Sequence, residues 1–156
     1  MTVRTELPSI VNSALKEVGF RRRQSNWYRL GPTLYAIVNL QKSNWDDLVY
    51  VNVGFTPVDH LAGDWQPSNK CSVRFRVEAL NAVREHISLL DEDAIAKMGS
   101  SDWRAAVSEK IVAPLAVAVN ETVDLEGLRA LLRDSLNKQV AINVKIKHLL
   151  DVFGPD

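Results

Sequence analysis

The segment from Phe20 to Phe55 contains four short runs in which apolar and polar residues alternate, separated by turn-forming residues. Alternation with a period of two is typical of β-strands that bury one face. Turns are expected at residues 24–26, 31–33 and 43–47, and each is too short to contain a crossover helix. The segment therefore predicts four consecutive antiparallel strands.

The register of the third hairpin follows if apolar side chains are kept on one face of the sheet. Pairing Lys42 with Val49 achieves this, and it makes Asn39 and Asn52 cross-strand neighbours on the opposite face. A slip of one residue would bury the two amides among apolar side chains, which is costly. The sequence therefore predicts a row of amides on the exposed face.

The first two hairpins are expected to have turns of three residues, which place Tyr28 opposite both Arg22 and Ala36. Tyr28 then lies on the apolar face and Trp27 on the polar face. Arg22 is the exception on the apolar face, and it is expected to reach out at the sheet edge. The face that is expected to be buried consists of Phe20, Tyr28, Leu30, Ala36, Val38, Leu40, Val49, Val51, Val53 and Phe55.

An apolar stripe at three- and four-residue spacing predicts a helix from Leu7 to Val18. Gly19 is expected to end this helix in the left-handed conformation. Residues 56–70 are rich in turn formers and predict a loop. Residues 71–77 alternate again and predict a fifth strand.

The second half of the chain predicts mainly helices, with N-caps at Ser101 and Asp124 and a bend at Pro114. The pattern leaves open the fold of residues 79–97, and whether residues 140–150 form a helix or a strand. The whole chain predicts an α+β fold, in which an antiparallel meander of four to five strands has helices packed on one face.

The length of 156 residues predicts a single domain over residues 1–156 with one core. The 19 basic and 19 acidic residues cancel, which argues against a dedicated duplex-DNA-binding protein. Residues 1–80 carry ten Lys/Arg and seven Asp/Glu, and residues 81–156 carry nine and twelve. A basic sheet with an acidic helical half is one interpretation of this asymmetry, and ordinary surface scatter is the other.

Cys71 is the only cysteine, so an intrachain disulfide is excluded. It is expected to be a small buried apolar residue rather than a nucleophile. The first residues contain no apolar stretch of signal-peptide length, and no run approaches the 18 apolar residues of a membrane span. A cytoplasmic location without membrane association is therefore expected.

The polar face of the predicted sheet is the candidate binding surface. Aromatic, guanidinium and amide groups on a rigid sheet can stack on a ligand and hydrogen-bond to it. Asn and Gln are poor strand formers, which favours a function over a merely solvated face stabilised by cross-strand pairs. The residues expected on this surface are Arg21, Arg23, Trp27, Arg29, Tyr35, Ile37, Asn39, Gln41, Tyr50, Asn52, Arg74 and Arg76.

No catalytic motif, phosphate-binding loop or metal-binding spacing occurs in the sequence. His60, His86 and His148 lie far apart along the chain. No catalytic residue, metal or other cofactor is therefore predicted.

Three motifs combine strand patterning with polar residues: Trp27-Tyr28-Arg29, the run VNLQKS from Val38 to Ser43, and Val51-Asn52-Val53-Gly54. They resemble the bacterial family catalogued as domain of unknown function 4304, most closely over residues 7–80. Members of that family are small, and some are similar to immunity proteins, which neutralise the toxins of neighbouring bacteria. The resemblance implies a role in binding and assigns no role to any residue.

Three functions follow from these observations. The first is a non-enzymatic binding protein, such as an immunity-type inhibitor of a bacterial toxin, whose partner presents an acidic patch or is a small anionic ligand. The second is an enzyme that acts on a small polar or anionic substrate in a deep pocket. The third is weak binding of single-stranded RNA by basic residues beside aromatic rings. The enzymatic cleft would be lined by Arg29, Tyr35, Asn39, Gln41 and Asn52.

Overall fold

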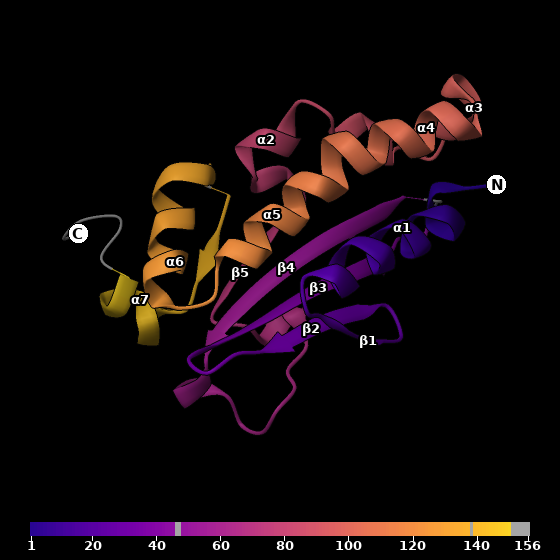
Figure 1. Cartoon of the computed structure of the whole chain (residues 1–156). Helices are drawn as coiled ribbons and strands as arrows, with labels where there is room; N and C mark the ends of the chain where they lie inside the picture. The colour runs from indigo at the N-terminus through magenta and orange to yellow at the C-terminus, as the bar shows by residue number, and fades with distance from the viewer. Residues whose placement is uncertain (46–47, 138, 151–156) are drawn as a thin grey trace.

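Six antiparallel strands form one sheet in the order β1-β2-β3-β4-β5-β6, and helices cover one of its faces (Figure 1). The structure is a computed structural model that describes residues 1–45, 48–137 and 139–150. The α+β meander is thus confirmed, with six strands rather than four to five. The strands are β1 (Arg21–Arg23), β2 (Asn26–Leu30), β3 (Leu34–Lys42), β4 (Val49–Pro57), β5 (Val73–Arg76) and β6 (Ala141–Ile142).

Two long helical segments lie across the covered face (Figure 1). One is α1 (Val3–Glu17), and the other runs without a break through α4 (Ser100–Val107), a π-helical segment (Ser108–Val112) and α5 (Ala113–Glu121). The shorter helices are α2 (Asn81–Arg84), α3 (Ala94–Met98), α6 (Leu125–Ala130) and α7 (Val144–Leu150). Single turns of 3-10 helix occur at Val58–His60, Ser68–Lys70, Val77–Ala79 and Ile87–Leu90, and a second π-helical segment at Leu131–Ser135.

The ends of α1 show why the helix starts earlier than expected. Thr2 and Thr5 form a capping box in which each side chain accepts a hydrogen bond from the other residue's backbone N–H. The helix therefore begins at Val3 and includes Pro8 in its interior. Gly19 has φ +88°, the left-handed conformation expected at the helix end.

The two N-caps predicted in the second half had different outcomes. Asp124 caps α6, because its Oδ1 accepts a 2.8 Å hydrogen bond from Gly127 N. Ser101 was the wrong choice, since α4 begins at Ser100 after Gly99. At the site of the expected bend, a π-helical segment ends at Val112, two residues before Pro114, and accommodates a residue without a backbone N–H.

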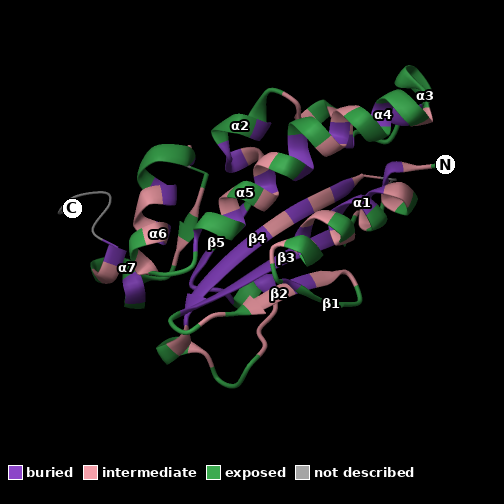
Figure 2. Cartoon of the chain, viewed as in Figure 1, coloured by how far each residue is buried: buried purple, intermediate pink, exposed green. Residues whose placement is uncertain are grey.

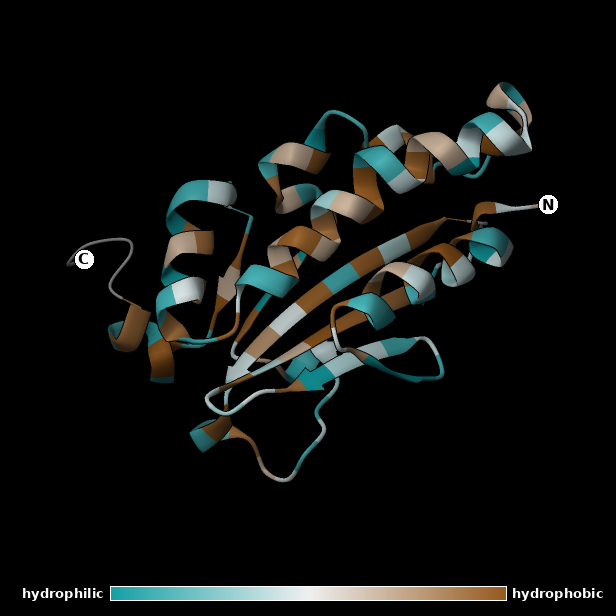
Figure 3. Cartoon of the chain, viewed as in Figure 1, coloured by the Kyte–Doolittle hydropathy of each residue, from teal (hydrophilic) through white to brown (hydrophobic). Residues whose placement is uncertain are grey.

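The core lies between the covered face of the sheet and the helices (Figure 2). Alternate residues of β3, β4 and β5 face it, and Figure 3 shows hydrophobic and polar segments alternating along β4. Val38, Val53 and Val73 are fully buried there. The prediction of this face was correct for Phe20, Ala36, Val38, Leu40, Val49, Val51, Val53 and Phe55, and the predicted fifth strand has the expected alternation.

The register predicted for the third hairpin is confirmed, with Lys42 opposite Val49 and Asn39 opposite Asn52. Residues 46 and 47 of its predicted turn lie outside the described residues.

The register predicted for β2 is wrong by one residue on both sides. The first turn has two residues, Gln24 and Ser25, and Arg22 pairs with Trp27 instead of Tyr28. The second turn, residues 31–34, is one residue longer than expected, so Tyr28 pairs with Ile37 instead of Ala36. Each shift by one residue exchanges the two faces of a strand. Trp27 and Arg29 consequently lie on the helix-covered face, while Tyr28 and Leu30 lie on the other.

Both regions that the sequence left open combine short elements. Residues 79–97 contain α2 and part of α3 with a 3-10 turn between them, and residues 140–150 contain both β6 and α7. None of the helices within the described ranges has the length and apolar character needed to cross a membrane.

Candidate functional site

The sheet face opposite the helices is divided into a covered half and an open half. The loop between β4 and β5 folds back over the end of the sheet that carries Tyr35 and Ile37. The Tyr35 hydroxyl donates a 2.6 Å hydrogen bond to Gln66 O and accepts one of 3.0 Å from Gln66 N. Leu61, Trp65 and Cys71 complete a small second core with Tyr28, Tyr35 and Ile37. Tyr35 and Ile37 are therefore fully buried rather than displayed as expected.

Close packing of this loop requires a glycine on β4. A Cβ at Gly54 would lie 2.7 Å from Cys71 Sγ and 3.2 Å from Ile37 Cγ2. Burial raises the pKa of the Cys71 thiol to about 11 and that of the Tyr35 phenol to about 12. Both groups therefore stay protonated to a higher pH than exposed groups of their kind, and Cys71 is the buried residue that the sequence predicted.

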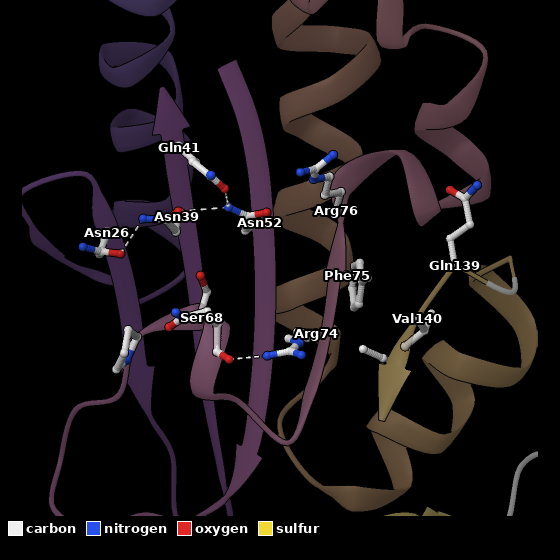
Figure 4. Close-up of a pocket in the computed structure, with 13 residues that line it drawn as sticks. Asn26, Asn39, Gln41, Asn52, Ser68, Arg74, Phe75, Arg76, Gln139 and Val140 are labelled. Carbon is white, nitrogen blue, oxygen red and sulfur yellow. Dashed lines mark hydrogen bonds between the residues drawn. The ribbon is translucent and has the colours of Figure 1, made fainter. Parts of the chain in front are cut away.

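The open half of the face contains a groove of about 750 Å³. Its floor is formed by amide side chains of β2, β3 and β4, and one wall by the two arginines of β5 (Figure 4). The groove is lined by Asn26, Asn39, Gln41, Asn52, Pro67, Ser68, Asn69, Arg74, Phe75, Arg76, Gln139, Val140 and Ala141.

The amides of the floor form a directional hydrogen-bonded row (Figure 4). Asn52 Nδ2 donates to Asn39 Oδ1 at 3.0 Å, and Asn39 Nδ2 donates to Asn26 Oδ1 at 2.8 Å. Asn52 Nδ2 also donates to Gln41 Oε1 at 3.0 Å. We call these four residues the amide ladder. Aligned amides polarise one another, so the ladder is a rigid and polar floor.

Each arginine of the wall is positioned by one contact. The Arg76 guanidinium lies over the ring of Tyr50, 4.0 Å from its centroid. Arg74 Nη1 donates to the backbone carbonyl of Asn69 in the loop (Figure 4). Both side chains are otherwise exposed. The N–H groups of a guanidinium lie in its own plane and point outward from its edge. Stacking on Tyr50 uses only the face of the Arg76 guanidinium, so its edge remains able to bind an anion.

The structure brings five of the predicted surface residues together in the groove: Asn39, Gln41, Asn52, Arg74 and Arg76. Tyr50 supports the groove from beneath Arg76. Arg21 lies on the edge strand outside the groove, and Arg23 stacks on Trp65 of the loop, with its Cζ 4.2 Å from the ring centroid.

Two predicted surface residues lie on the wrong face because of the shifted register of β2. Trp27 is fully buried against α1, where its Nε1 donates to Asn12 Oδ1 at 3.0 Å. Arg29 points into the helical layer and donates to main-chain carbonyl oxygens there, including that of Val119. Burial lowers the pKa of Arg29. The cleft that was expected to unite Arg29 and Tyr35 with the amides is therefore not formed.

Groove residues that the sequence did not predict come from three parts of the chain. Asn26 was assigned to a turn, but it belongs to β2, and the observed pairing of β2 with β3 places it beside Asn39. The other missed residues come from the loop (Ser68 and Asn69) and from the segment around β6 (Gln139 to Ala141). They carry no local signal, because only the tertiary fold brings them to the sheet.

The described residues contain no group of three or more His, Cys, Asp or Glu side chains that could hold a metal ion. Residues 11–116 match the family described as Domain of unknown function (DUF4304). No curated protein and no solved structure matches the chain.

Proposed function

Since the chain belongs to the family of domain of unknown function 4304, its role must be inferred from the site, and we propose that it is a non-enzymatic binding protein. The groove over the amide ladder is the surface that contacts the partner, and the partner contributes negative charge. An immunity-type inhibitor of a bacterial toxin is the specific form of this function that we propose.

The observation that carries the proposal is the convergence of two guanidinium groups on a row of amides. Arg74 and Arg76 are the only ionisable side chains among the described residues that line the groove. Guanidinium groups bind carboxylates and phosphates, and the amides can donate and accept hydrogen bonds beside them. The lining therefore suits the recognition of an anionic, polar surface.

The same lining favours binding over catalysis. A general base or an activated nucleophile requires a carboxylate, an imidazole or a thiol within hydrogen-bond reach of the reacting group. The described lining offers the Ser68 hydroxyl, but no such group to activate it. Cys71 is buried beneath the loop, where its thiol remains protonated at neutral pH.

Preorganisation of the groove also supports a role in binding. Tyr50 holds Arg76, the loop carbonyl of Asn69 holds Arg74, and the ladder amides hold one another. Side chains that are already ordered lose less conformational entropy when a partner binds. The desolvation cost of holding these side chains in place is small in the free protein, because they remain exposed or partly exposed.

A protein partner is favoured over a small anionic ligand by one further residue. Trp45, which follows β3 beyond Gln41, is 94% exposed. Exposed tryptophans are typical anchors of protein–protein interfaces. The groove volume alone would also suit a small molecule. A substitution of Trp45 therefore distinguishes a protein partner from a small anionic ligand.

The test is a pull-down with tagged wild-type protein, followed by affinity measurement for the captured partner. The groove variant is Arg74→Gln/Arg76→Gln, and the matched control is Arg21→Gln/Arg84→Gln, which removes the same charge at exposed sites outside the groove. We expect the groove variant to lose the partner and the control to retain it. Equal retention by both variants would disprove the assignment of the groove. Trp45→Ala should weaken binding of a protein partner and leave that of a small anion unchanged.

A further inference from the structure

We infer that the groove binds an extended acidic segment of the partner in which two carboxylate residues are separated by one residue, as in Asp-X-Asp. The inference rests on the proposed binding function and specifies the chemistry and conformation of the ligand. The carboxylates pair with Arg74 and Arg76, while the backbone of the segment hydrogen-bonds to the amide ladder.

The spacing of the two arginines supports this geometry. Arg74 and Arg76 are alternate residues of β5 and point to the same face of the sheet. Alternate residues of a strand are about 6.6 Å apart along its axis. An extended segment that lies over this face along β5 has the same repeat, so its side chains at positions i and i+2 match the two guanidinium groups. A helical segment presents i and i+2 on different sides and does not match.

The chemistry of the two arginines suits carboxylates. Each guanidinium is held by one contact and retains N–H groups for a fork-like pair of hydrogen bonds. Glu78 interacts electrostatically with Arg76, but it lies in the 3-10 turn after β5 and does not line the groove. No Asp or Glu occurs among the described lining residues, so the positive charge of the wall is available to a ligand.

The amide ladder complements a peptide backbone. Both N–H groups of Asn52 are used within the ladder, so its Oδ1 remains an acceptor, while both N–H groups of Gln41 remain donors. The ladder therefore offers an acceptor on Asn52 and donors on Gln41. A peptide unit of the ligand has an N–H for the acceptor and a C=O for a donor. Backbone recognition of this kind requires an extended ligand, whose N–H and C=O groups are unpaired.

The groove is less suited to single-stranded nucleic acid. Bases bind proteins mainly by stacking on aromatic faces. Arg76 covers the ring of Tyr50, and Phe75 is almost completely buried. The described lining therefore offers no open ring for a base, which favours a peptide over RNA.

Fluorescence anisotropy with three labelled peptides of one length tests the inference. The first carries Asp-Gly-Asp between Gly-Ser flanks, the second carries the isomer Asp-Asp-Gly, and the third carries Asn-Gly-Asn. We expect the first to bind wild-type protein about tenfold more tightly than its isomer, because adjacent side chains of an extended chain point to opposite sides. The neutral peptide should bind least well.

Variants connect that preference to the two arginines. Arg76→Gln and Arg74→Gln should each remove the preference for Asp-Gly-Asp, and Arg76→Lys should reduce it because lysine lacks the fork. Arg21→Gln/Arg84→Gln should leave it unchanged. Circular dichroism and thermal melting of each variant establish that it is folded.

Several outcomes would overturn the inference. Equal affinity for the two acidic isomers would mean that only net charge matters, and tighter binding of inorganic phosphate or of a uridine decanucleotide would identify another ligand class. If the groove variants lose the captured partner while no peptide binds, the extended acidic segment is excluded and the proposed binding function stands. If the partner is retained and no peptide binds, both fail.

Discussion

The Arg29 guanidinium on β2 donates a 2.7 Å hydrogen bond from Nη2 to the backbone carbonyl oxygen of Val119, which lies 90 residues later at the end of α5. The same nitrogen donates to Thr122 O at 3.3 Å, and Nη1 donates to Val18 O at 3.2 Å. The carbonyl groups at helix C-termini lack intrahelical partners and favour cations. Arg29 therefore fixes the ends of α1 and α5 to the sheet.

Replacing Arg29 by methionine should lower the free energy of unfolding by about 2–4 kcal/mol, because three carbonyl groups lose a charged donor. Urea denaturation measures the change. Arg21→Met, at an exposed site on β1, is the matched control and should cost less than about 0.5 kcal/mol. Equal stability of the two variants would show that the Arg29 hydrogen bonds are replaced by water without cost.

The role of Arg29 illustrates where the sequence is informative and where it is not. The faces of β3 and β4 were predicted correctly because their alternation is long and a slip would bury amides. The face of β5 was predicted correctly because valine and phenylalanine alternate there with two arginines. β2 is short and its register depends on the flanking turns. The turn before it uses Gln24 at φ +56°, a conformation usually taken by glycine or asparagine. Without that signal a longer first turn is the natural choice, which shifts β1 against β2. The second turn has four residues instead of the expected three, and this difference exchanges the two faces of β2 relative to β3.

The candidate site was predictable only where it is built from the sheet. The amides of β3 and β4 and the arginines of β5 were found from strand alternation. The loop that covers Tyr35 and the segment near β6 that closes the groove are placed by contacts between residues far apart in sequence, for which periodicity gives no information. The boundary between the covered and the open half of the face is therefore a result of tertiary structure alone.

Gly54→Ala should destabilise the protein by about 1–3 kcal/mol, because the new methyl group would lie 2.7 Å from Cys71 Sγ. The position of the loop over the sheet must then shift. In a double-mutant cycle with Cys71→Gly, the destabilisation by Gly54→Ala should be smaller than in the wild-type background. Denaturation of the four proteins gives the coupling energy, and strict additivity would mean that the methyl group is accommodated elsewhere.

Stability should fall at alkaline pH through Tyr35. Burial raises its pKa from 10.0 to about 12. The folded protein therefore retains the phenol proton more tightly than the unfolded chain, so the contribution to stability is complete below pH 10 and is lost as pH rises towards 12. A spectrophotometric titration should show a tyrosine component near pH 12 that is absent from Tyr35→Phe. A titration that is identical in the two proteins would contradict the assignment.

Asn39 and Leu40 are neighbours on β3 that face opposite sides of the sheet, and they test whether the amide ladder is structural. Leu40 lies in the core and is 5% exposed, so Leu40→Ala should cost about 2–4 kcal/mol of stability. Asn39 is partly exposed and its hydrogen-bond partners can turn to water, so Asn39→Ala should cost about 1 kcal/mol or less. Urea denaturation measures both losses, and binding of the captured partner is measured in parallel. A stable Asn39→Ala variant with weakened binding is expected for a recognition surface, whereas a loss as large as that of Leu40→Ala would mean that the ladder serves the fold.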